Sequence, residues 1–185
     1  MRKIAIIFPG IGYHCDKPLL YYGKKLAVEN GYEIIEVPYK GFQSGIKGNA
    51  KLMYEAFQLA LTQTEEILGQ NAFDSSDQLL LISKSIGTAV AAAYEKKHGI
   101  KAKNIYFTPV AETFQFMEEG SGIVFHGTGD SWANTESLVE ECEKRKLPYY
   151  LTEKANHSME NGNVVQDLQT LQEIMKICEK YIGEE

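Results

Sequence analysis

The sequence predicts an α/β protein: a three-layer α/β/α sandwich built on a mostly or wholly parallel six-stranded sheet. Two patterns lead to this fold class. Short apolar runs alternate with longer amphipathic segments along the chain. The apolar runs are mostly continuous in hydrophobicity, which is typical of parallel strands that are covered on both faces. Right-handed crossovers between such strands place helices on both sides of the sheet.

The length favours one domain over residues 1–185, since domains mostly contain roughly 100–200 residues. Hydrophobic residues make up 44% of the chain and charged residues 24%, which is ordinary for a folded protein. No repeat, low-complexity block or linker rich in proline and serine divides the sequence. We therefore expect a single hydrophobic core.

Six brief apolar runs are the expected strands. In chain order they are Ile4–Phe8, Glu33–Val37, Leu79–Ser83, Asn104–Phe107, Ile123–His126 and Tyr149–Leu151. The runs contain three to five residues each and lack helical periodicity, as expected of buried strands.

Five segments between and after these runs are expected to be helices. In chain order they are about Lys17–Asn30, Gly48–Leu68, Ile86–His98, Thr135–Lys146 and Val164–Ile182. Gly31, Gly69 and Gly99 stand where a helix end favours a residue that tolerates positive φ. In the last helix one apolar stripe recurs at three- and four-residue steps and is expected to pack: Val164, Val165, Leu168, Leu171, Ile174, Met175, Cys178 and Ile182.

The charge balance limits the partners. Nineteen Lys and Arg residues against 25 Asp and Glu residues give a net charge of −6. This charge suits neither a nucleic-acid backbone nor an anionic membrane surface, so neither is expected as a partner. No stretch approaches the roughly 20 apolar residues that cross a bilayer.

The compartment follows from processing signals and cysteines. The first apolar run stops at Pro9, short of the about 7–15 apolar residues of a signal peptide. Cys15, Cys142 and Cys178 are odd in number and widely spaced, without the pattern of a disulfide framework or a zinc site. We expect reduced thiols and a cytoplasmic protein. The oligomeric state stays open.

A tight turn follows the third expected strand, where ligands bind in such sheets. The run Leu81-Ile82-Ser83-Lys84-Ser85-Ile86-Gly87 leads into a helix that opens with very small residues. In a nucleophile elbow the central residue is strained and projected, so the positions two before and two after it must be small. Here they are Ser83 and Gly87 around Ser85. The segment taken alone is equally compatible with serines that cap the next helix.

Two more strand ends complete a possible catalytic set. Asp130 follows the fifth strand and His157 follows the sixth. Taken alone, Asp130 is more typical of a turn than of a catalytic site, and a single histidine in a loop is usually only exposed to solvent. With Ser85 they stand in the order nucleophile, acid, base. A serine needs a base within reach, and that base needs a carboxylate, so the combination predicts a triad of Ser85, Asp130 and His157.

Donors for an oxyanion are expected in the loop after the first strand. This loop, Phe8-Pro9-Gly10-Ile11-Gly12, is flanked by glycines, and its backbone N–H groups are free to face a ligand. We expect the N–H groups of Ile11 and Ile86 to form the oxyanion hole.

These residues resemble the α/β-hydrolase superfamily over nearly the whole chain. The likeness runs from Ile4–Gly12 through Ser83–Gly87 and Gly127–Asp130 to Asn156–Ser158. It implies a minimal, lidless hydrolase fold that lacks the family's first two strands. It also implies a serine esterase or thioesterase with Ser85 as nucleophile, Asp130 as acid and His157 as base. The family's usual His-Gly is Pro9-Gly10 here, and its first elbow glycine is Ser83.

Only the segment Thr108–Gly120 occupies the place of the family's lid, which implies an open site for a small-molecule ester, thioester or similar acyl substrate. Phe114, Phe116 and Met117 either form one wall of an acyl pocket or rest on the core, and resting on the core is favoured. Tyr13, Phe114 and Trp132 are candidate substrate-binding residues. No cofactor and no metal are expected.

Other assignments remain open in the sequence. Glu112 is the reserve for the acid, while His14 and His126 are weaker candidates for the base. Lys84 is expected to be a solvated cation.

Three other functions also remain open. Gly10-Ile11-Gly12 with Glu36 weakly resembles a dinucleotide site, but Cys15 takes the place of the third glycine. A hydrolase-fold acyltransferase and a non-catalytic small-molecule-binding protein are the remaining alternatives.

Overall fold

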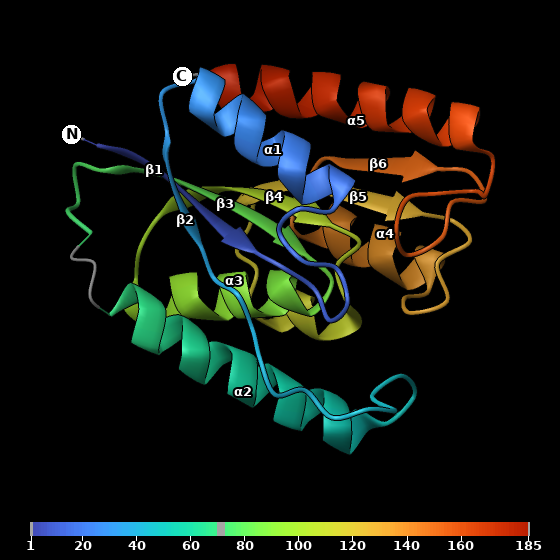
Figure 1. Cartoon of the computed structure of the whole chain (residues 1–185), viewed down its shortest axis with the longest axis horizontal. Coiled ribbons are helices and arrows are strands. Elements are labelled where there is room, and N and C mark those ends of the chain that lie inside the picture. Colours follow the sequence, from blue (N-terminus) through green and yellow to red (C-terminus); the bar gives the residue numbers. More distant parts are fainter. Residues whose placement is uncertain (1, 70–72, 185) are drawn as a thin grey trace.

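The computed structural model describes residues 2–69 and 73–184 and is built on one six-stranded sheet (Figure 1). The strand order is β2-β1-β3-β4-β5-β6, and every neighbouring pair is parallel. The strands are β1 (Lys3–Phe8), β2 (Glu33–Glu36), β3 (Gln78–Lys84), β4 (Ala102–Phe107), β5 (Gly122–Gly127) and β6 (Tyr149–Thr152). The predicted parallel sheet is confirmed, with boundaries within two residues of those expected.

Helices cover both faces of the sheet and make the predicted three layers. They are α1 (Pro18–Glu29), α2 (Ala50–Leu68), α3 (Ile86–His98), α4 (Thr135–Lys144) and α5 (Val164–Gly183), with a short 3-10 helix η1 (Ala111–Gln115). Helices α1 and α5 lie side by side on one face, and α2 and α3 lie on the other (Figure 1). In the part of the chain that the structure describes, no helix is both long and apolar enough to span a membrane.

Alternation along β3 explains how the sheet serves two cores. Leu80 and Ile82 pack into the cluster with α1 and α5, whereas Leu79 and Leu81 pack into the cluster with α2 and α3. Successive side chains of a strand point to opposite faces. A strand buried on both faces must therefore be apolar throughout, which is why β3 shows no alternation in its sequence.

Two of the three predicted glycine helix ends have the expected backbone. Gly31 follows α1 with φ +82°, and Gly99 follows α3 with φ +59°. The prediction for Gly69 is wrong, because its φ is −60° and its N–H donates to the carbonyl of Glu65. At Gly69 the chain leaves α2 while still in right-handed helical geometry, so no positive φ is needed there.

The apolar stripe of α5 is only partly buried. Ile174, Cys178 and Ile182 lie in the core as predicted. The prediction for the first two turns is wrong, since Val164 and Leu168 remain 74% and 61% exposed and Val165 is also exposed. Helix α5 is longer than α1, and its first turns extend past the start of α1 (Figure 1). No other helix of the described residues covers them there.

Candidate active site

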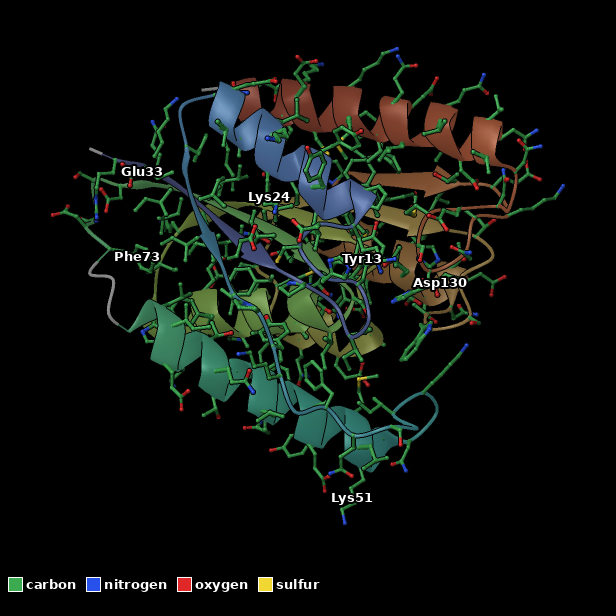
Figure 2. All side chains as sticks on the ribbon, viewed as in Figure 1. Tyr13, Lys24, Glu33, Lys51, Phe73 and Asp130 are labelled. Atoms are coloured by element: carbon green, nitrogen blue, oxygen red, sulfur yellow. The ribbon has the colours of Figure 1, made fainter. Side chains whose placement is uncertain are left out.

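The three residues of the predicted triad follow three strands at the same edge of the sheet. Ser85 comes directly after β3, Asp130 lies three residues beyond β5, and His157 lies in the loop between β6 and α5. Figure 2 labels Asp130 beside the arrowhead ends of the strands, with Tyr13 on the same side of the molecule. Parallel strands bring their carboxyl ends together, so residues far apart in sequence meet here.

Ser85 stands in a strained turn. Its φ of 56° and ψ of −126° are uncommon for a residue other than glycine. Its N–H donates to the carbonyl of Phe107 at 3.0 Å, which ties the turn to β4. Gly87 is required two residues later, because a Cβ there would lie 2.4 Å from the carbonyl oxygens of Phe8 and Pro9. The turn therefore has the geometry predicted for a nucleophile elbow.

Ser83 fits where glycine is usual in the resembled family. Its side chain is fully buried, and its hydroxyl donates to the carbonyl of Ile105 in β4 at 3.2 Å. This hydrogen bond satisfies the buried hydroxyl, so the larger residue is accommodated without leaving a polar atom unpaired.

His157 bridges the other two side chains. Its Nε2 lies 2.7 Å from Ser85 Oγ, and its Nδ1 lies 2.6 Å from Asp130 Oδ2. The second carboxylate oxygen of Asp130 accepts from the backbone N–H of Trp132 at 2.8 Å. The side chain of Asp130 is fully buried, while that of His157 keeps some exposure. The three side chains thus form one continuous hydrogen-bonded series.

Burial and pairing act in opposite directions on the two titrating groups. Burial lowers the pKa of His157 below its ordinary value, although the hydrogen bond to Asp130 raises it. Burial raises the pKa of Asp130, but the hydrogen bonds from His157 and Trp132 outweigh it and leave the pKa below its ordinary value. Asp130 is therefore ionised and His157 is neutral at neutral pH, which is the state in which a histidine can accept a proton.

The loop that carries His157 is held against the end of β5. A Cβ at Gly127 would lie 2.2 Å from the carbonyl oxygen of Ala155, so only glycine permits this approach. Thr108, directly after β4, donates from Oγ1 to the carbonyl of His157 at 3.2 Å. Only its place after a strand marks Thr108 in the sequence, because its hydrogen bond depends on a loop 49 residues away.

The alternative acid and bases lie elsewhere. Glu112 lines a cavity and forms no side-chain hydrogen bond with another described residue. His14 is exposed beside Asp16. His126 is buried, with Nε2 2.9 Å from Thr135 Oγ1 and Nδ1 3.9 Å from Asp130 Oδ2. His126 thus lies behind Asp130, and only His157 among these histidines contacts Ser85 in the described chain.

The two expected oxyanion donors have free N–H groups. A pair of hydrogen bonds between Gly10 and Tyr13 closes the loop after β1, at 3.0 and 3.2 Å. Within the described residues, the N–H groups of Ile11 and Ile86 donate to no other group. Ile11 packs on the apolar cluster that contains Ile86, which brings the two segments together. Their role in an oxyanion hole stays a prediction.

An apolar cavity of about 430 Å³ opens beside Ile86, between α2, α3 and η1. Phe57 and Phe116 form part of its wall, and their rings stack at 5.6 Å. A neighbouring hollow shares Met53, Val110 and Glu112 with this cavity and extends to Trp132. The ring of Trp132 stacks on that of His157 at 5.3 Å. Two adjoining hollows therefore lead from Trp132, at the edge of the predicted triad, to the apolar cavity beside α2.

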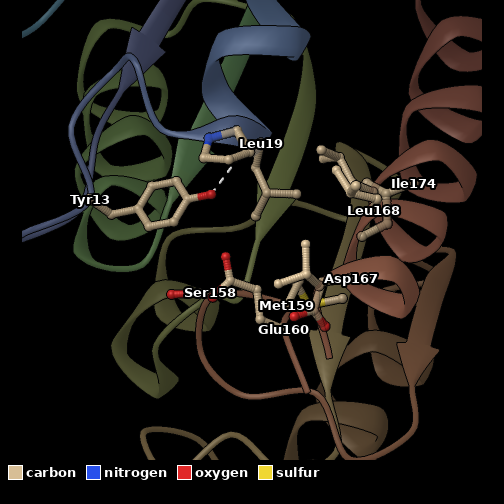
Figure 3. Close-up of a pocket in the computed structure, with 11 residues that line it drawn as sticks. Tyr13, Leu19, Ser158, Met159, Glu160, Asp167, Leu168 and Ile174 are labelled. Carbon is tan, nitrogen blue, oxygen red and sulfur yellow. Dashed lines mark hydrogen bonds between the residues drawn. The ribbon is translucent and has the colours of Figure 1, made fainter. Parts of the chain in front are cut away.

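The three candidate substrate-binding residues have different surroundings. Trp132 lies beside His157, on which its ring stacks. Phe114 is buried in the cluster of α4, with Arg145 over its ring, and does not line the cavity beside Ile86. Tyr13 lines a separate cavity of about 270 Å³ on the side of α1 and α5, where its hydroxyl accepts from the N–H of Leu19 (Figure 3).

The expectation that the Thr108–Gly120 segment rests on the core holds for Phe114 and Met117, whereas Phe116 lines the cavity beside Ile86.

The expectation that Lys84 is solvated is wrong. Its side chain is fully buried. Lys84 continues the face of β3 that carries Leu80 and Ile82, and that face is covered by α1, α5 and the loop of Tyr13. Charged side chains are usually exposed, which is why Lys84 was expected to be solvated. Its place in β3, however, puts the side chain in the core.

No group of three or more His, Cys, Asp or Glu residues in the described ranges is arranged to hold a metal ion. Glu36, the acid of the dinucleotide alternative, pairs with Lys24. Cys15, Cys142 and Cys178 are buried, free thiols.

Comparisons with known proteins point to one fold. No protein-family model and no curated protein sequence matches the chain. Among solved structures, the chain is similar to a serine hydrolase without lid from Xanthomonas campestris, with a TM-score of 0.70 and 12% identity over 97% of this chain and 80% of that one. It is also similar to Est1E from Butyrivibrio proteoclasticus with ferulic acid bound, with a TM-score of 0.71 and 11% identity over 98% and 88%. The esterase Pf2001 from Pyrococcus furiosus gives a TM-score of 0.65 and 12% identity over 98% and 84%. The chain therefore has the α/β-hydrolase fold, in a small form whose described residues place only η1 between β4 and β5.

Proposed function

We propose that the protein is a serine hydrolase that cleaves a small carboxylic ester or thioester through an acyl-enzyme intermediate. The observation that carries this proposal is the position of His157 between Ser85 Oγ, at 2.7 Å, and Asp130 Oδ2, at 2.6 Å. Such a series activates a serine hydroxyl, which is otherwise a weak nucleophile. The similar solved structures, which include esterases, support hydrolysis in general.

The proposed reaction has two halves. Ser85 Oγ attacks the carbonyl carbon of the substrate while His157 Nε2 takes the hydroxyl proton. The tetrahedral intermediate carries its negative charge on the former carbonyl oxygen, where the N–H groups of Ile11 and Ile86 donate. When the intermediate collapses, the bond to the leaving alcohol or thiol breaks, and His157 returns the proton to that group.

Water completes the cycle in the second half. It attacks the acyl carbon, and His157 takes one of its protons. The ester bond to Ser85 then breaks, the carboxylic acid leaves, and Ser85 recovers its proton. Asp130 stays ionised throughout and stabilises the imidazolium that forms twice per cycle.

The cavity beside Ile86 supports a small or medium acyl group. Its lining is mainly apolar and its volume is about 430 Å³. We propose that the acyl group enters this cavity and that the leaving group lies toward Trp132, whose ring stacks on His157.

The buried free thiols suit a reducing compartment, which supports a cytoplasmic location.

Labelling with a fluorophosphonate probe tests the proposal directly. We expect one adduct per chain, located on Ser85 by mass spectrometry of peptides, and hydrolysis of a short-chain aryl ester. The Ser85→Ala variant should lose both while keeping its circular dichroism spectrum, and Ser83→Ala should keep the labelling. Unchanged turnover in Ser85→Ala would refute the assignment. Labelling of Ser85 without release of acid from any ester or thioester would instead indicate a non-hydrolytic acyl carrier or binder.

A further inference from the structure

Lys84 is an unusual residue for the centre of a fold. It is the immediate neighbour of Ser85, its side chain is fully buried, and its Nζ has no hydrogen-bond partner in the described part of the chain. A buried amine without a partner destabilises a folded protein, whereas an apolar residue of similar volume would fill the same space at no such cost. Packing alone therefore does not explain a lysine here.

The surroundings of Lys84 join the elbow to the loop after β1. Its Nζ lies 4.9 Å from the centroid of the Tyr13 ring, within reach of a cation–π interaction. Tyr13 belongs to the loop of Ile11, which the paired hydrogen bonds between Gly10 and Tyr13 close. Lys84 thus lies next to Ser85, on the face of the sheet that α1 and α5 cover.

The charged and titratable groups around Lys84 come from three loops. Asp130 attracts its ammonium group, and that group in turn disfavours the imidazolium form of His157. The neighbouring strand β4 pairs the apolar Phe107 with Lys84. Other charges act on these partners: Lys47 on His157, His126 on Asp130, and Glu160 on Tyr13.

This inference builds on the proposed function. We propose that Lys84 is a positioning residue of the hydrolytic site: a buried cation next to Ser85 that keeps His157 neutral. It touches no reacting atom in this role and acts through His157 alone.

The direction of the effect follows from when Lys84 carries its charge. Burial lowers the pKa of Lys84 to about 7. The cation is thus present chiefly below pH 7, where His157 would otherwise take up a proton and lose its function as a base. Above pH 7 the amine is neutral and no longer opposes the imidazolium that forms during turnover. Lys84 thus extends the active range toward acid, and its opposition to the imidazolium is lost as the pH rises through about 7.

The test is a titration of His157 by NMR in the full chain and in Lys84→Met. The His157 resonance is assigned by its loss in His157→Ala. We expect the pKa of His157 to rise by about 0.5 unit or more in Lys84→Met. The acid limb of kcat/KM should move to higher pH by the same amount, and the melting temperature should rise. Ile82→Met, on the same face of the same strand, changes packing without charge and should leave the titration unchanged.

Two results would overturn the inference. One is a His157 titration that is the same in the full chain and in Lys84→Met. The other is a shift that Ile82→Met reproduces, which would assign the effect to packing. Lys84→Leu replaces Lys84→Met in the same titration if the methionine variant does not fold. The titration needs no turnover, so a chain that reacts with no fluorophosphonate would refute the proposed function while the effect of Lys84 on His157 is still decided.

Discussion

Thr108 Oγ1 donates a hydrogen bond to the carbonyl oxygen of His157 at 3.2 Å. Thr108 is buried and has a φ of +43°, a strained value for a β-branched residue. Its N–H donates to the carbonyl of Phe125 in β5 at 2.8 Å. The end of β4, which contributes none of the three predicted catalytic side chains, therefore holds the loop that carries His157.

We expect Thr108→Val to lower kcat/KM by about three- to tenfold and stability by about 1 kcal/mol. Valine keeps the shape of threonine but cannot donate to the carbonyl of His157, so the loop is held less firmly. Thr64→Val is the matched control, because Thr64 is also buried and donates to one backbone carbonyl, that of Ala60. It should lose similar stability by urea unfolding and keep full activity. Equal losses of activity in both variants would contradict the role of Thr108.

Asp130→Asn should reduce kcat by about two to four orders of magnitude. An amide at this position cannot hold the charged form of His157, and it accepts from His157 Nδ1 less strongly than a carboxylate. Glu112→Gln is the control, since Glu112 lines the cavity without contacting His157. Steady-state kinetics of both variants decide whether Asp130 or Glu112 is the acid. A neutral Asp130→Asn beside a crippled Glu112→Gln would move the acid to Glu112.

The pH dependence of turnover should reflect the buried state of His157. Its pKa lies below the ordinary 6.5, chiefly because of burial. Activity requires the neutral imidazole, so kcat/KM should rise with pH and reach half its maximum below pH 6.5. Between the folded pKa and the unfolded one the unfolded chain binds more protons, so the contribution of His157 to stability should fall as pH drops through this window. A flat rate profile, or a midpoint above the ordinary value, would contradict this expectation.

Phe116→Ala should widen the acyl preference. Phe116 stacks on Phe57 in the cavity wall, and removing its ring extends the space beside Ile86. We expect kcat/KM for longer acyl chains to rise by about tenfold relative to acetyl esters. Phe114→Ala is the comparison, because Phe114 is buried against α4 outside the cavity. It should cost about 3–5 kcal/mol of stability without changing the ratio between acyl chains. A changed ratio in Phe114→Ala alone would place the acyl group elsewhere.

The layout of the sheet and the positions of the three polar residues were predictable because both depend on local patterns. Continuous apolar runs mark buried parallel strands, and the small residues Ser83 and Gly87 mark the turn around Ser85. The positions of Ser85, Asp130 and His157 after the ends of parallel strands then place them at one edge of the sheet.

Features set by distant neighbours were not predictable in this way. The burial of Lys84 depends on Tyr13 and on helices at both ends of the chain. Its charge alone therefore led to the wrong prediction that the side chain is exposed to solvent. The exposure of Val164 depends on where α1 begins, which the periodicity of α5 does not contain. Thr108 shows the same limit, because its partner is a backbone carbonyl whose place only the folded loop defines.

The contact between Ser85 and His157 joins positions 72 residues apart and crosses three consecutive strand pairings, from β3 through β4 and β5 to β6. A nascent or partly unfolded chain with any of those pairings open has no assembled relay. The reactivity of Ser85 should then be lost in one step when these strands separate, rather than gradually. A covalent probe of Ser85 therefore also reports how completely this half of the molecule has folded.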